Sequence, residues 1–182
     1  MKYTVHSKKT APEQSVPVLD QVEQAFGFIP NMTAVLASSP LGLSAYVTVN
    51  GLLQTHSSLT PEEQQVAILS INRENGCTYC MAAHSAAAEM AGVDEETIQA
   101  LRDGREPDNA KYAAVAKLAR SLVEQRGWVS EEEQQAFLDA GYTPAHILDL
   151  VTIAALKTIS NYTNHLAETP LDEAFEARRW EK

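Results

Sequence analysis

The sequence predicts an all-α fold, and three observations indicate it. Apolar residues recur at helical spacing through most of the 182 residues, and helix start and stop signals separate these segments. No segment shows the alternation of apolar and polar residues that is typical of a half-buried strand. The chain is long enough to bury one core, so we expect a single helical domain over residues 1–182.

Capping and turn residues divide the chain into nine expected helices. The clearest start is Thr60-Pro61-Glu62-Glu63, in which Thr60 and Glu63 can form a capping box and proline stands at the first helical position. Glycines after the last apolar turn, Gly76 and Gly92, mark two helix ends. The expected helices span residues 18–26, 31–38, 41–54, 61–75, 77–91, 95–101, 109–123, 131–140 and 144–166, with Asp94, Asp108, Ser130 and Thr143 as further N-caps.

The charge balance excludes several classes of partner. The formal net charge is -10, so nothing offsets the phosphates of nucleic acid or of an anionic membrane. The most apolar run, residues 147–159, is interrupted by Asp149, Thr152 and Lys157 and is too polar for a membrane span. The first six residues do not resemble a signal peptide, so we expect a cytoplasmic protein.

The two cysteines of the chain, Cys77 and Cys80, stand close together at the start of an expected helix, and His84 follows them. If the helix includes Cys77, the three side chains fall at i, i+3 and i+7 on one face. The free N–H groups of the first turn favour a thiolate, and His84 can accept a proton. In a reducing compartment this pattern predicts a thiol–disulfide redox centre.

Two other interpretations of the same residues stay open at this point. The cysteines could be buried apolar packing groups. Alternatively, Cys77, Cys80 and His84 could bind zinc with one more ligand. The candidates for that fourth ligand are His6, His56, His146 and His165.

Simpler roles are expected for the neighbouring polar residues. Tyr79 is expected to pack rather than to donate a hydroxyl to the site. Glu63 is explained by the capping box. His165 ends the last helix in an unusual polar run, and it could either serve the site or interact with the helix C-terminus.

The segment from Leu59 to Val66, followed by Asn75-Gly76-Cys77-Thr78-Tyr79-Cys80-Met81-Ala82-Ala83-His84, resembles the AhpD-like alkylhydroperoxidases of the carboxymuconolactone decarboxylase superfamily. The N-x-C-x-x-C-x-x-x-H pattern carries this resemblance, which is close over residues 59–92. These residues form the expected redox core.

The resemblance implies an oxidoreductase that reduces hydroperoxides through a redox-active disulfide, in a homo-oligomer such as a trimer or hexamer. It implies that Cys80 is the peroxidatic cysteine, that Cys77 resolves it, and that His84 belongs to a proton relay. It implies no cofactor or metal, and an electron donor that is a lipoyl protein or a thioredoxin-type partner. A thiol–disulfide oxidoreductase that does not reduce peroxide remains the alternative.

The sequence departs from the family at two positions of the proton relay. The family has a glutamate where this chain has Gln65, and a histidine between the cysteines where it has Tyr79. Glutamine cannot ionise, so we expect a slow peroxidase, with Glu74 and His165 as other candidates for the relay. Cys77 is expected nearer solvent and closer to the positive end of the helix, which would give it the lower pKa of the two thiols. The resemblance instead favours attack by Cys80.

Overall fold

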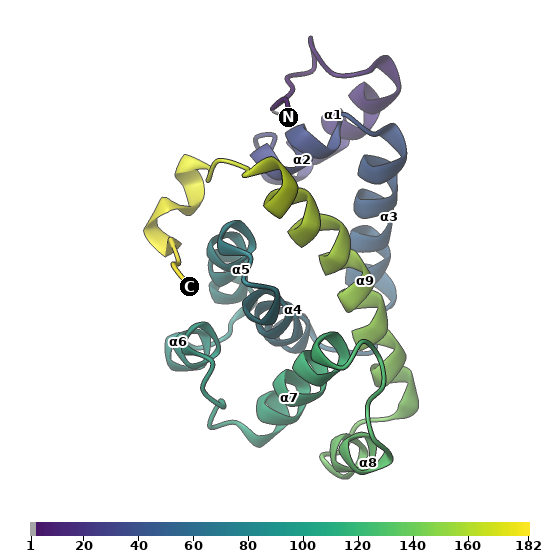
Figure 1. The fold of residues 1–182 in the computed structure, drawn as a ribbon, viewed down its shortest axis with the longest axis vertical. Helices are drawn as coiled ribbons and strands as arrows, with labels where there is room; N and C mark the ends of the chain where they lie inside the picture. The colour runs from purple at the N-terminus through teal and green to yellow at the C-terminus, as the bar shows by residue number, and fades with distance from the viewer. Residues whose placement is uncertain (1–2) are drawn as a thin grey trace.

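The computed structural model describes residues 3–182, and this part of the chain is helical with no strand, which confirms the all-α prediction (Figure 1). Two short 3-10 helices, η1 (Glu13–Ser15) and η2 (Glu173–Arg178), lie near its ends. The α-helices are α1 (Val16–Phe26), α2 (Asn31–Leu36), α3 (Pro40–His56), α4 (Pro61–Asn75), α5 (Thr78–Ala91), α6 (Glu95–Asp103), α7 (Ala110–Glu124), α8 (Glu131–Asp139) and α9 (Pro144–Ala167).

Most of the predicted helix boundaries are confirmed by their caps. The Thr60 hydroxyl accepts from the Glu63 N–H, and the Glu63 carboxylate accepts from the Thr60 N–H. One predicted cap is wrong. Asn109, not Asp108, caps α7, because helical backbone begins at Ala110 and the residue directly before it reaches the free N–H groups of the first turn.

The helix α4 lies in the middle of the fold (Figure 1) and packs against α5, α7 and α9. The long helix α9 crosses the molecule beside α3, and α8 packs on α7. The larger apolar core surrounds α4 and includes residues from the helices that touch it. Its fully buried members include Val66, Leu69, Ile71, Met81, Ile98, Val115, Leu150 and Ile153.

A second, smaller apolar cluster lies at the end of the molecule where the N-terminal helices gather. It joins residues of α1, α2 and α3 to the start of α5, and it contains both cysteines. Its buried members are Leu19, Met32, Leu36, Ala37, Leu43, Cys77, Tyr79 and Cys80. The chain thus places its two thiols inside a packed cluster rather than at the surface.

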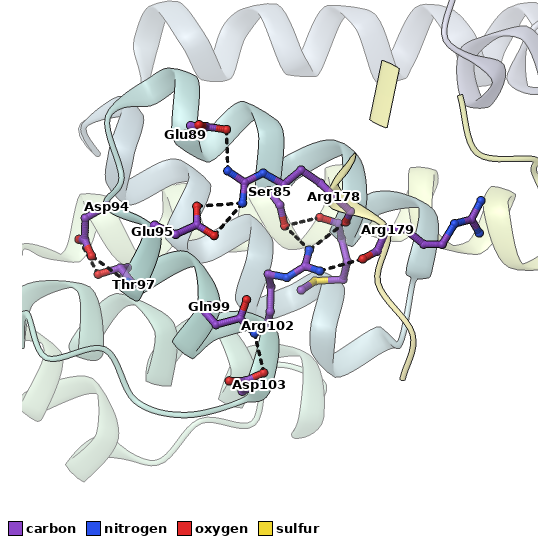
Figure 2. Close-up of polar contacts among 11 residues, drawn as sticks. Ser85, Glu89, Asp94, Glu95, Thr97, Gln99, Arg102, Asp103, Arg178 and Arg179 are labelled. Atoms are coloured by element: carbon purple, nitrogen blue, oxygen red, sulfur yellow. Dashed lines mark hydrogen bonds and ion pairs between the residues drawn. The ribbon is translucent and has the colours of Figure 1, made fainter. Parts of the chain in front are cut away.

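The C-terminal segment after α9 is fastened across α5 and α6 (Figure 2). The guanidinium of Arg178 pairs with Glu89 and with Glu95, each at 2.7 Å. Arg102 of α6 donates to the hydroxyl of Ser85 at 2.8 Å and to the carbonyl of Arg178 at 3.0 Å. These contacts hold the segment beside the helix that carries Cys80.

The outer face of α3 and α9 is apolar and carries little charge. Helix α3 contains no Asp, Glu, Lys or Arg. The exposed apolar side chains of these two helices are Leu41, Leu52, Leu148, Val151, Tyr162 and Leu166. Within residues 3–182, no helix is both long and apolar enough to cross a membrane.

Candidate active site

The turn between α4 and α5 positions both cysteines. Gly76 adopts a left-handed conformation with φ of 67°, which ends α4 and reverses the chain. Cys77 is the N-cap of α5 in extended backbone, so it stands just before the helix that was expected to include it. Both thiols are buried, Cys77 with 1% and Cys80 with 2% of its surface exposed. Neither thiol therefore lies at the surface, and these exposed fractions do not place Cys77 nearer solvent than Cys80.

A lysine from α9 lies against the thiol of Cys80. The Lys157 ammonium is 3.8 Å from the Cys80 sulfur, and the residue is only 1% exposed. A buried ammonium is costly unless an anion or acceptors compensate it. The Cys80 thiolate is the anion that this position provides.

The histidine of the motif contacts Lys157 rather than either sulfur. His84 Nε2 is 3.0 Å from Lys157 Nζ, and His84 Nδ1 is 3.0 Å from Gln65 Oε1. An ammonium can only donate, so Nε2 accepts from it and the imidazole proton is on Nδ1, where it donates to Gln65. Gln65 and His84 thus form one neutral chain of hydrogen bonds that ends at the buried ammonium.

The charges at the site separate the pKa values of the two thiols. Burial by itself raises the pKa of Cys80, but the hydrogen bond from Cys77 and the positive charge of Lys157 outweigh it and lower that pKa to about 5. The pKa of Cys77 is raised, because its thiol donates to Cys80 and because it is buried. Burial and the charge of Lys157 lower the pKa of His84, so this imidazole stays neutral.

Amide side chains hold the sulfurs and the adjacent backbone. Asn164 of α9 donates through Nδ2 to Cys80 at 3.2 Å and lies 3.8 Å from Cys77. Asn72 donates to the Cys80 carbonyl at 3.2 Å, and Asn161 donates to Asn72 at 3.0 Å. This ladder fixes the first turn of α5 against α4 and α9.

Tyr79, between the cysteines, connects the site to both ends of the chain. Its ring packs edge-on against Phe175, as expected for a packing residue. Its hydroxyl donates to the Asp172 carboxylate and accepts from the Met32 N–H. The same carboxylate accepts from the Asn31 N–H at 3.1 Å, so the start of α2 and the C-terminal segment meet above the cysteines.

The structure does not bring every sequence candidate to the thiols. Glu74 lies in a shallow pocket beside Arg73, Arg105 and Arg120, and His165 is exposed and stacks on Tyr162. Neither residue makes a hydrogen bond to Cys77, Cys80 or His84 in the part of the chain that is described.

The zinc interpretation finds no complete set of ligands in this arrangement. No group of three or more His, Cys, Asp or Glu side chains within residues 3–182 could hold a metal ion. The physical reason is that the Lys157 ammonium, and not a fourth ligand, lies between His84 and Cys80.

Two residues that contact the sulfurs, Lys157 and Asn164, were not predicted from the sequence. A signal for each was present, since Lys157 interrupts the apolar run of α9 and Asn164 lies in the polar run after it. A charged residue in the apolar stripe of a core helix indicates a buried partner. The position of that partner could not be read from helical spacing.

Comparisons with known proteins show what this chain is similar to. The carboxymuconolactone decarboxylase family matches residues 40–122, which include both cysteines, Gln65 and His84 but not Lys157 or Asn164. Over these residues, which are less than half of the chain, the sequence is similar to that family. No curated protein matches the sequence.

Several solved structures share the fold. An alkylhydroperoxidase AhpD core protein from Ralstonia eutropha JMP134, an uncharacterized peroxidase-related protein, has a TM-score of 0.85 at 20% identity, covering 96% of this chain and 93% of that one. A peroxidase-related protein from Silicibacter sp. TM1040 has a TM-score of 0.82 at 16% identity, with coverages of 98% and 94%. A cysteine-to-alanine variant of the debrominase Bmp8, in complex with 2,3,4-tribromopyrrole, has a TM-score of 0.81 at 19% identity, with coverages of 98% and 95%. At these identities the likeness shows the fold alone.

Proposed function

We propose that this protein is a dithiol peroxidase that reduces small hydroperoxides. The observation that carries the proposal is the Cys80 sulfur held 3.8 Å from the buried Lys157 ammonium, with the Cys77 thiol beside it. A thiolate is the nucleophile in such chemistry, and a pKa of about 5 keeps Cys80 ionised at neutral pH. A second thiol within reach allows a disulfide to form.

The proposed first step consumes the hydroperoxide. The Cys80 thiolate attacks the oxygen that bears the hydrogen, the O–O bond breaks, and Cys80 becomes a sulfenic acid. The departing alkoxide takes a proton from the Lys157 ammonium and leaves as an alcohol. His84 and Gln65 position that ammonium through the Nε2 and Nδ1 contacts.

The proposed second step closes the disulfide. The Cys77 sulfur attacks the Cys80 sulfenic sulfur, the S–O bond breaks, and the proton of the Cys77 thiol leaves with the hydroxyl as water. A dithiol electron donor, of the lipoyl or thioredoxin type, then reduces the disulfide and becomes oxidised itself. The two protons of that donor restore the Cys77 thiol and the Lys157 ammonium.

The experiment that tests this function uses single cysteine variants with one equivalent of tert-butyl hydroperoxide. We expect the Cys77→Ser variant to accumulate a sulfenic acid on Cys80 that a dimedone-type reagent traps. The Cys80→Ser variant should not react appreciably, because burial still raises the pKa of its remaining thiol. Two free thiols in the wild type after peroxide treatment, with no trapped sulfenic acid, would overturn the proposal.

A reductive dehalogenase is the second candidate. The sulfur of Cys80 lies in an apolar cluster with Met32, Leu43 and Tyr46, and such surroundings suit an apolar aromatic substrate. Bmp8, which shares the fold, is named a debrominase. In this reaction the dithiol gives two electrons and forms a disulfide, while an aryl C–Br bond is replaced by C–H and bromide is released. Bromide release from 2,3,4-tribromopyrrole, with no reaction toward hydroperoxide, would favour this candidate.

A further inference from the structure

Asn164 uses only one end of its buried amide. Its Nδ2 donates to the Cys80 sulfur at 3.2 Å, and the residue is 5% exposed. Its Oδ1 is buried and has no hydrogen-bond partner within residues 3–182, where Thr169 Oγ1 is the other buried side-chain atom without one. A buried acceptor that is left unpaired costs about 1–3 kcal/mol.

The neighbouring amides show that the unpaired oxygen is specific to Asn164. Asn72 donates to the Cys80 carbonyl and accepts from Asn161. Asn161 in turn accepts from Asn75 at 2.8 Å, so both ends of each of these two amides are used. An unpaired acceptor in an otherwise satisfied network calls for an explanation, and a bound ligand is one.

We propose that Asn164 Oδ1 accepts a hydrogen bond from the hydroxyl of the hydroperoxide substrate; this inference rests on the proposed function. A planar amide places its oxygen beside its nitrogen, and the nitrogen is already on the thiolate. Asn164 therefore binds the nucleophile with one end and the oxygen that it attacks with the other. This arrangement brings the two reacting atoms together before the O–O bond breaks.

Lys157 and His84 cannot take this role. The Lys157 ammonium has no acceptor, and the His84 Nε2 already accepts from it. The His84 Nδ1 carries the proton that it donates to Gln65. Of Lys157, His84 and Asn164, Asn164 is thus the residue with an acceptor to offer.

The assignment defines the class of oxidant. The hydrogen that Asn164 binds stays on the transferred oxygen, so the same bond holds the Cys80 sulfenic acid after the alkoxide has left as an alcohol. Hydroperoxides and hydrogen peroxide carry this hydrogen. Dialkyl peroxides and disulfides do not, so Asn164 selects oxidants with a hydroxyl at the oxygen that is attacked.

The test separates this bond from the general effect of Asn164 on the thiolate. In a Cys77→Ser background, the rate constant of Cys80 with tert-butyl hydroperoxide is divided by the rate constant with methyl methanethiosulfonate. The second reagent also needs the thiolate but has no hydrogen-bond donor. Asn164→Leu should lower both rate constants but should lower the ratio by about a further tenfold, the effect of one hydrogen bond.

Two more variants complete the test. Asn164→Asp keeps an acceptor, so above the pH at which Cys80 ionises its ratio should return to the wild-type value. If Asn164→Leu does not fold, a low ratio in Asn164→Asp would still overturn the assignment. Thr163 directly precedes Asn164 in α9 and makes no hydrogen bond to either sulfur. Thr163→Val should therefore leave the ratio unchanged.

The outcomes distinguish this inference from the proposed function. A ratio that is unchanged in Asn164→Leu, or equally low in Asn164→Asp, would overturn the role of Asn164 while hydroperoxide reduction by the wild type stood. A wild type that reacts with methyl methanethiosulfonate but with no hydroperoxide would overturn the proposed function and this assignment together.

Discussion

Replacing Lys157 with methionine removes the positive charge that lies 3.8 Å from the Cys80 sulfur while keeping a long apolar side chain. Two unit charges about 4 Å apart interact by about 4 kcal/mol at an effective dielectric constant of about 20. Because 1.36 kcal/mol corresponds to a tenfold change in acid dissociation, Lys157→Met should weaken the acidity of Cys80 about a thousandfold. At neutral pH the thiolate fraction would fall from nearly all to roughly a tenth.

The assay is the pH dependence of Cys80 alkylation, together with the ultraviolet absorbance of the thiolate, in a Cys77→Ser background. The charge of Lys157 still lowers the pKa of Cys80 in this background, so with Lys157 present the rate should be level at neutral pH and fall tenfold per pH unit below that lowered pKa. In Lys157→Met the fall should begin at a much higher pH. Hydroperoxide reduction should lose a further factor of roughly 10²–10⁴ that alkaline pH does not restore, because the proton donor to the alkoxide is gone.

Lys117→Met is the matched control, since it removes the same charge from an exposed position of α7. It should leave the pH profile unchanged. The reasoning is refuted if Lys157→Met is folded and its thiolate still forms near the wild-type pH.

Three further predictions concern the site and its surroundings. Gln65→Glu should move the acidic limb of the pH–rate profile to higher pH, because a second anion near Lys157 competes with the Cys80 thiolate. A gain of roughly 10² or more in the plateau rate would instead show that the wild type lacks a general base. Asp172→Ala should speed the reaction of the reduced thiols with the bulky reagent DTNB more than their reaction with methyl methanethiosulfonate. The reason is that this carboxylate ties the Asn31 N–H to the hydroxyl of Tyr79, the residue between the two cysteines. Equal effects on both reagents would contradict that covering role. We also expect a homo-oligomer that forms through the apolar face of α3 and α9. Leu148→Glu, at a side chain that is 66% exposed, should then lower the mass measured by light scattering. A wild type that is monomeric at micromolar concentration would exclude this homo-oligomer.

The positive charge of Lys157 changes how the glutamine at position 65 is interpreted. From the sequence alone, glutamine at this position predicts a slow peroxidase, because the family glutamate of the proton relay is absent. In the structure Gln65 is the neutral acceptor for His84 Nδ1, and it leaves Cys80 as the anion beside the buried ammonium. A glutamate at position 65 would compete for that ammonium, so the neutral side chain is consistent with an ionised Cys80.

Local interactions explain what the sequence by itself determined. The capping box of Thr60 and Glu63, the left-handed Gly76 and the spacing of Cys80 and His84 involve residues within a few positions of each other, and these features were predicted. The wrong prediction of the N-cap of α7 also concerns neighbouring residues. Asp108 and Asn109 are both good N-caps, and only the backbone conformation decides which one is used.

The electrostatic character of the site, in contrast, was decided only by the tertiary structure. Lys157 and Asn164 reach Cys80 from 77 and 84 residues away because α9 packs across α4 and α5. Helical spacing shows which side chains share a face, but it does not show which residue of another helix lies opposite them. The pKa of a thiol depends on burial and on the nearest charges, so helical spacing could predict that the two thiols lie close together but not the groups that separate their pKa values.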